Sequence, residues 1–137
     1  MKKIPLLLLA ILISLNVFGE SFHLVCDGKE EVVSQGKNYS FPKVTQTIKV
    51  DDKSLFYDGW EIKNYKDNNN NFVYEKTKND IYFLYNRFYD KGREMKITGT
   101  IDRISGVISV KEVNNFTEYV DVIIFEGKCK KSNTPLF

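Results

Sequence analysis

Histidine, tryptophan and cysteine are scarce in this chain of 137 residues, which has one His, one Trp and two Cys. His23 has no second histidine or free thiolate beside which to form a zinc site. A serine–histidine–acid triad would have to recruit the same His23. The sequence also lacks the G-x-S-x-G, H-E-x-x-H and P-loop motifs. We therefore expect no catalytic residues, no metal and no cofactor.

An excess of charge of one sign is also missing. Twenty basic residues stand against eighteen acidic ones, which gives a net charge of +2 at pH 7. This balance is too close to indicate a nucleic-acid or membrane-surface partner by charge alone, and we expect no nucleic-acid partner. With only three Pro and eight Gly, and 42% hydrophobic residues, the chain is neither collagenous nor disordered. Its length predicts one folded domain.

The longest hydrophobic run lies at the N-terminus. Met1-Lys2-Lys3 is a short basic region, residues 4–17 are largely apolar, and small residues permit cleavage after Gly19 or Ser21. This is the pattern of a secretory signal peptide, and the run is shorter than the roughly 20 residues of a membrane-spanning helix. We therefore predict a signal peptide over residues 1–21 and a single β domain over residues 22–137. The protein is then periplasmic or secreted, with no stable membrane span after cleavage.

Two cysteines, Cys26 and Cys129, remain in the predicted mature chain. An oxidising compartment favours their pairing, and only one pairing is available. The flanking segments, Phe22-x-Leu24-x-Cys26 and Phe125-x-Gly127-x-Cys129, alternate, so each Cys shares a face with the large apolar residues of its strand. The bond would close a loop of about 100 residues, worth up to about 4.7 kcal/mol in the chain-entropy model. We predict a Cys26–Cys129 disulfide between the first and last strands.

Apolar and polar residues alternate with period two along the chain, and helical periodicity does not recur. Turn residues such as Asp27-Gly28, Asp90-Lys91-Gly92 and Ser105-Gly106 separate the alternating segments. This pattern predicts an all-β antiparallel meander of about eight strands, which forms a small barrel or a two-layer sandwich. The predicted strands are 22–26, 44–50, 60–65, 72–76, 80–88, 95–104, 106–112 and 119–129, with a further short strand near 31–33.

The segment 81–89 is apolar or aromatic at most positions. A central strand covered on both faces is the simplest interpretation. The segment also fits the wall of a ligand cavity, because aromatic rings line many binding pockets. On that interpretation Trp60, Tyr82 and Tyr85 are candidate ligand-facing aromatics, on one sheet face or at the mouth of the barrel.

Two charged features allow a functional interpretation. Arg103 lies beside the predicted Ser105-Gly106 turn, where it either pairs with Asp102 or presents its guanidinium to an anionic partner. The acidic residues are numerous enough for two of them to face each other across a cleft, as in carboxylate-dependent hydrolases. The acidic candidates are Asp58, Glu61, Asp102 and Glu126.

Three short motifs resemble those of a loose set of small exported bacterial proteins of unassigned function. They are Phe22-x-Leu24-x-Cys26, Asp102-Arg103-x-Ser105-Gly106 and Phe125-x-Gly127-x-Cys129. The resemblance implies export and a disulfide-tied β fold, and it implies no activity. Cys26-Asp27-Gly28 is also similar to the end of the first strand in periplasmic inhibitors of C-type lysozyme. Those inhibitors are small antiparallel barrels, and their S-G-x-R-Y-like inhibitory segment is missing here.

Together these observations predict an exported, non-catalytic β module that binds a ligand or protein in the cell envelope or outside the cell. One alternative is an inhibitor of a cell-wall hydrolase, which an assay of lysozyme activity would test. Another alternative is a small hydrolase that uses a carboxylate pair.

Overall fold

The computed structural model describes residues 21–132, so the predicted signal peptide, except Ser21, lies outside the described residues. The described residues form ten strands and one short 3₁₀ helix, η1 (Asp90–Gly92). None of their helices is long and apolar enough to cross a membrane. The strands are β1 (Phe22–Ser34), β2 (Lys37–Val50), β3 (Ser54–Tyr57), β4 (Trp60–Lys63), β5 (Tyr65–Lys66), β6 (Asn70–Lys76), β7 (Asp80–Phe88), β8 (Glu94–Asp102), β9 (Val107–Asn115) and β10 (Val120–Ser132).

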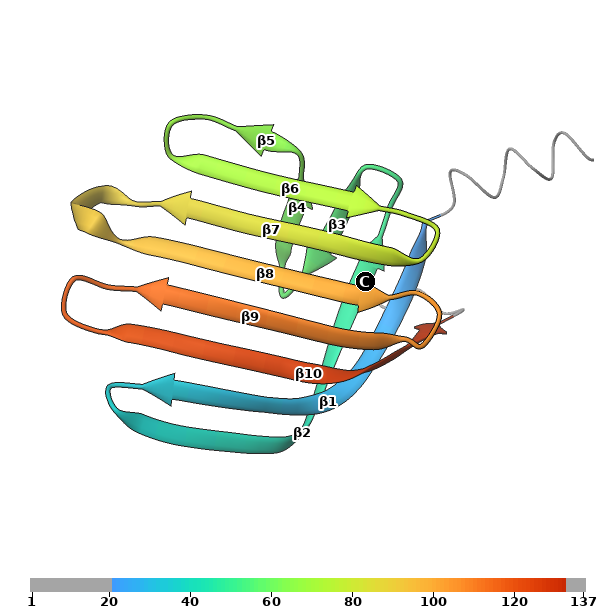
Figure 1. Ribbon diagram of the computed structural model, residues 1–137, viewed down its shortest axis with the longest axis horizontal. Helices are drawn as coiled ribbons and strands as arrows, with labels where there is room; N and C mark the ends of the chain where they lie inside the picture. Colours follow the sequence, from blue (N-terminus) through green and yellow to red (C-terminus); the bar gives the residue numbers. More distant parts are fainter. Residues whose placement is uncertain (1–20, 133–137) are drawn as a thin grey trace, which may run out of the picture.

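The ten strands form one antiparallel sheet in the order β4-β3-β2-β1-β10-β9-β8-β7-β6-β5 (Figure 1). Along this order, strands that are consecutive in sequence pair with each other, and β1 pairs with β10. Among the described strands, only β4 and β5 follow one another in sequence without pairing. The fold is therefore a nearly closed barrel built from a meander, and the predicted fold class is confirmed. The predicted count of about eight strands was too low, because it omitted the short strands β3 and β5, which have four and two residues.

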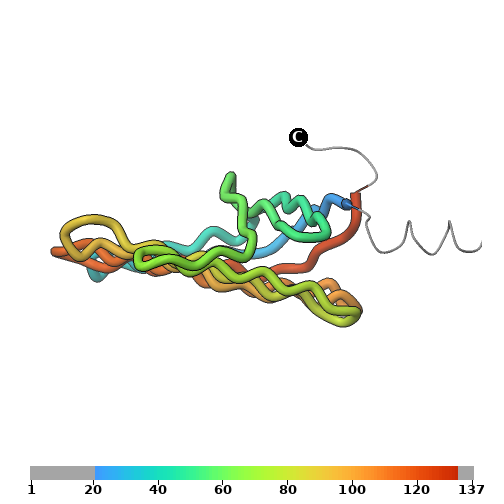
Figure 2. Tube along the Cα trace, turned by 90° about the horizontal axis from the view of Figure 1, so that it is seen from above, coloured from blue at the N-terminus to red at the C-terminus, as the bar shows by residue number. Residues whose placement is uncertain are grey.

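The sheet folds over itself at one end and is a single layer at the other (Figure 2). At the folded end, β3 and β4 cross the inner face of β6 and β7. Ring centroids of Tyr57 and Phe83 lie 5.7 Å apart there, and those of Trp60 and Tyr85 lie 5.1 Å apart. The core lies between these two layers, and its largest fully buried side chains are Phe83, Phe125, Ile48, Leu55, Ile62, Ile81, Ile97 and Ile108.

Asn64 and Tyr74 bridge the gap between β4 and β6. The backbone N–H of Tyr74 donates to Asn64 Oδ1 at 2.8 Å, and the Tyr74 hydroxyl donates to the carbonyl of Asp51 at 2.7 Å. Side chains thus supply hydrogen bonds where the strand pairing is incomplete. The predicted strand 60–65 is consequently wrong in one respect, because it is interrupted at Asn64.

A pair of glycines allows β1 and β10 to approach closely. Gly28 lies directly opposite Gly127. A Cβ on Gly28 would lie 2.1 Å from the carbonyl oxygen of Glu126, and one on Gly127 would lie 2.5 Å from that of Asp27. The predicted Asp27-Gly28 turn is therefore wrong, because β1 continues through both residues to Ser34.

The predicted disulfide is confirmed between Cys26 and Cys129, which face each other directly in the β1–β10 pairing. Their sulfur atoms lie 2.01 Å apart, and their Cα atoms 3.9 Å apart. The other strand pairs of the described sheet consist of strands that follow one another in sequence, whereas these two cysteines are 103 positions apart. The other paired strands are joined by the turns between them, whereas β1 and β10 are joined covalently by this disulfide.

Candidate functional site

The folded end of the barrel opens into a pocket of about 370 Å³. The start of β1, the end of β10, and the turns after β6 and β8 surround it. Figure 2 shows β10 rising away from those two turns at this end. We call this pocket the basic mouth, because four basic residues line it: Lys78, Arg103, Lys130 and Lys131. Lys131 lies on the inner face with Leu24, its partner on β1, and Lys130 lies on the outer face.

The floor of the basic mouth is apolar. Leu24, Ile81 and Ile101 line the pocket and are buried members of the core. Phe22 also lines it and packs against the same core. These residues alternate along their strands, so the face that fills the barrel also provides the pocket floor. Leu24, Ile81 and Ile101 are at most 7% exposed, so a ligand with an apolar portion would find its apolar contact mainly at the half-buried Phe22.

Arg103 connects the two turns that border the basic mouth. Its backbone N–H donates to the carbonyl of Asn79 at 2.8 Å, and its guanidinium donates to the carbonyl of Thr77. This second bond uses one of the five guanidinium N–H groups and fixes the direction of the side chain. The remaining donors form a fork that suits a carboxylate or phosphate.

Asp102 is the one carboxylate that lines the basic mouth. Its side chain accepts hydrogen bonds from the backbone N–H groups of Ser105, at 3.0 Å, and Ile104, at 2.8 Å. These two bonds hold the pKa of Asp102 below its usual value. Within residues 21–132, Asp102 forms no ion pair with Arg103. The carboxylate therefore stabilises the turn and leaves the guanidinium available.

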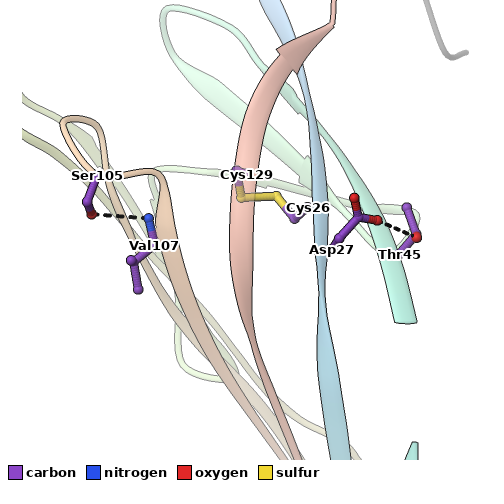
Figure 3. Close-up of a disulfide and its surroundings, with 6 residues drawn as sticks. All are labelled: Cys26, Asp27, Thr45, Ser105, Val107 and Cys129. Atoms are coloured by element: carbon purple, nitrogen blue, oxygen red, sulfur yellow. Dashed lines mark hydrogen bonds between the residues drawn. A yellow bond between two sulfur atoms is a disulfide. The ribbon is translucent and has the colours of Figure 1, made fainter. Parts of the chain in front are cut away.

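The turn after β8 lies beside Cys129, the β10 half of the disulfide, and is hydrogen-bonded to it (Figure 3 shows Ser105, Val107 and Cys129). The N–H of Cys129 donates to the carbonyl of Gly106 at 2.7 Å, and the N–H of Val107 donates to Ser105 Oγ at 3.2 Å. Gly106 has a φ of +79°, and a Cβ there would lie 2.5 Å from the carbonyl oxygen of Cys129. Only glycine fits this position without strain, so the turn that carries Arg103 is tightly anchored.

Lysines from two elements complete the rim. Lys130 and Lys131 come from the end of β10, and Lys78 comes from the turn after β6. The ammonium of Lys131 lies 4.5 Å from the centroid of the Phe22 ring, a cation–π contact that orients it over the pocket wall. Four basic residues and one carboxylate give the lining a formal charge of +3. The whole chain carries only +2, so positive charge is concentrated at this pocket.

The three predicted ligand-facing aromatics do not form one surface. Trp60 and Tyr85 are in ring contact, and Tyr85 stacks on Phe72 with centroids 4.4 Å apart. Tyr85 is only 4% exposed, so it has little surface to offer a ligand. Tyr82 pairs with Thr100 on the opposite, outer face of the sheet. Of the predicted contacts, Arg103 alone lines the basic mouth.

Acidic side chains gather at the other end of the covered inner face. Glu30 and Glu112 project from β1 and β9, and Asp58 lies at the tip of the β3–β4 turn with a φ of +50°. Burial raises the pKa of Glu112, and the charges of Asp58 and Glu30 raise it further. Burial and Asp58 also raise the pKa of Glu30. Asp58 was among the predicted acidic candidates, whereas Glu61 is exposed beside Lys63 at 3.9 Å.

The lysines of the basic mouth were not predicted, although one signal was present in the sequence. Lys130 and Lys131 directly follow Cys129, so any disulfide to the first strand must bring them beside the start of that strand. Lys78 had no comparable signal, because only the bending of the sheet brings the turn after β6 to this pocket.

The sequence matches no protein-family model and no curated protein, and no solved structure matches the chain. The function is therefore argued from the geometry and charge of the basic mouth.

Proposed function

We propose that this protein is an exported, non-catalytic module that binds an anionic group attached to an apolar body, and that the basic mouth is its binding site. One observation carries the proposal, namely that a lining with a formal charge of +3 surrounds a floor of core residues. Arg103, Lys78 and Lys131 are the groups that would bind the anion. Phe22, which is half-buried in the lining, is the residue that would contact the apolar part, because Leu24, Ile81 and Ile101 are at most 7% exposed.

The dimensions and chemistry of the pocket narrow the class of ligand. A volume of about 370 Å³ lies at the lower end of the range for small-molecule sites. An inorganic ion would satisfy the cations and leave the half-buried Phe22 in contact with water, and a neutral apolar molecule would leave the cations without partners. A ligand that combines both parts uses the whole pocket. Its anionic group is a phosphate or a carboxylate, which match the guanidinium fork.

Calorimetric titration of the mature protein with hexyl phosphate tests this proposal, with inorganic phosphate and hexyl glucoside as probes of each half of the ligand. We expect hexyl phosphate to bind most tightly of the three. Lys131→Gln should weaken that binding, and Lys96→Gln, an exposed lysine of β8 outside the pocket, should not. Equal binding of hexyl glucoside, or equal effects of the two variants, would contradict the proposal.

The same samples test the expectation that the module is non-catalytic. Hexyl phosphate is an ester, so its hydrolysis would release inorganic phosphate. We expect no phosphate above the rate in protein-free buffer. Release that follows the protein concentration would establish an enzyme, and the acidic residues near Glu112 would then be the first to substitute.

A further inference from the structure

An exposed isoleucine stands on the rim of the basic mouth. Ile104 lies at the tip of the turn after β8, and 81% of it is exposed. Its backbone N–H donates to Asp102, so the turn holds this side chain in an outward position. Val107, the first residue of β9 directly after this turn, is 52% exposed. Single exposed apolar residues are common on protein surfaces, so their surroundings decide whether they have a role.

Basic residues lie beside this apolar tip, and Asp102 is the one carboxylate of the same lining. Arg103 is its neighbour in sequence, and Lys130 and Lys131 line the same pocket as Ile104. Lys128 lies directly opposite Val107 in the pairing of β9 with β10. An apolar tip with several basic residues beside it suits the surface of an anionic bilayer. The tip enters the boundary between headgroups and acyl chains, and the cations meet the lipid phosphates.

We infer that this end of the barrel docks on an anionic lipid surface, with Ile104 and Val107 inserted and the cations of the basic mouth on the headgroups. The inference rests on the proposed function, because the basic mouth would then open towards the lipid that carries its ligand. A stable protein interface needs roughly 800 Å² from each partner, far more than two small apolar side chains provide. A bilayer needs only shallow insertion combined with charge.

Co-sedimentation with lipid vesicles tests the inference. We expect the mature protein to bind vesicles that contain phosphatidylglycerol and to dissociate from them at high salt. It should not bind vesicles of pure phosphatidylcholine. Ile104→Ser should lower the partition coefficient about tenfold, as expected when an inserted isoleucine is lost. Val120→Ser is the matched control, because Val120 is 45% exposed at the start of β10, at the opposite end of that strand from the basic mouth.

A second variant reports insertion directly. Tryptophan emission shifts to the blue when the ring leaves water, so Ile104→Trp should show a blue shift with phosphatidylglycerol vesicles only. Equal partition of the Ile104→Ser and Val120→Ser variants, or no shift for Ile104→Trp, would overturn the inference.

The wild-type protein separates this inference from the proposed function. If it binds hexyl phosphate monomers but neither type of vesicle, the docking inference fails and the proposed function stands. If it binds neither the monomers nor the vesicles, both fail.

Discussion

Removal of the disulfide should cost this protein a large part of its stability. The bond joins residues 103 positions apart. Opening a loop of that size raises the chain entropy of the unfolded state by an amount worth about 4.7 kcal/mol at 25 °C. Replacement of both cysteines by alanine also removes two sulfur atoms, one of them from the fully buried Cys26, which adds about 1 kcal/mol. Since domains of this size are stable by roughly 5–15 kcal/mol, the loss is severe.

Urea unfolding, followed by circular dichroism, measures the effect. The wild-type protein, the same protein with its disulfide reduced, and the Cys26→Ala/Cys129→Ala variant should be compared. We expect the free energy of unfolding to fall by about 4–5 kcal/mol on reduction, and the urea dependence to steepen, because the unfolded chain becomes less compact. A decrease in the free energy of unfolding below about 1 kcal/mol would refute the reasoning, because the backbone pairing would then be enough to keep β1 and β10 together.

Three further changes test other parts of the fold by thermal or urea unfolding. Gly127→Ala should destabilise the protein by at least about 2 kcal/mol, because its new Cβ would lie 2.5 Å from the carbonyl oxygen of Asp27. An unchanged free energy of unfolding would contradict the close approach of β1 and β10. Tyr74→Phe should cost about 1 kcal/mol through loss of the hydrogen bond to Asp51, and no loss would mean that water replaces it. Burial raises the pKa of Glu112 above its ordinary value of 4.5, so the native state keeps that proton to a higher pH than the unfolded state does. The free energy of unfolding should therefore fall as the pH rises from 4.5 through the native pKa of Glu112. Glu112→Gln should reduce this dependence of stability on pH. An unchanged dependence would show that another group causes it.

The sequence was sufficient to predict the fold class and the disulfide. Period-two alternation assigns each side chain to a face, and the predicted export of a chain with only two cysteines leaves a single pairing. The exact strands needed more information. Gly28 was predicted in a turn, yet it allows a close approach to Gly127, a partner about 100 positions away. The local sequence around Gly28 does not reveal that it pairs with Gly127.

The candidate site was only partly predictable. Arg103 could be selected because its turn was recognisable, but its lysine partners come together only when the sheet bends. The grouping of Tyr82 with Tyr85 could have been rejected from the sequence, because residues three apart on a strand point to opposite faces. The balanced overall charge was also misleading, because it averages a basic end and an acidic end of one barrel.

The pairing of the first strand with the last also constrains how the chain matures. A polypeptide appears from its N-terminus, so β1 exists for most of synthesis with only β2 beside it. Its other edge pairs with β10, the last strand among the described residues, and contacts so distant in sequence form slowly. Until β10 is synthesised, the β1–β2 hairpin therefore exposes an unpaired edge that favours aggregation. The two thiols can be oxidised to the disulfide only after this late pairing has brought them together.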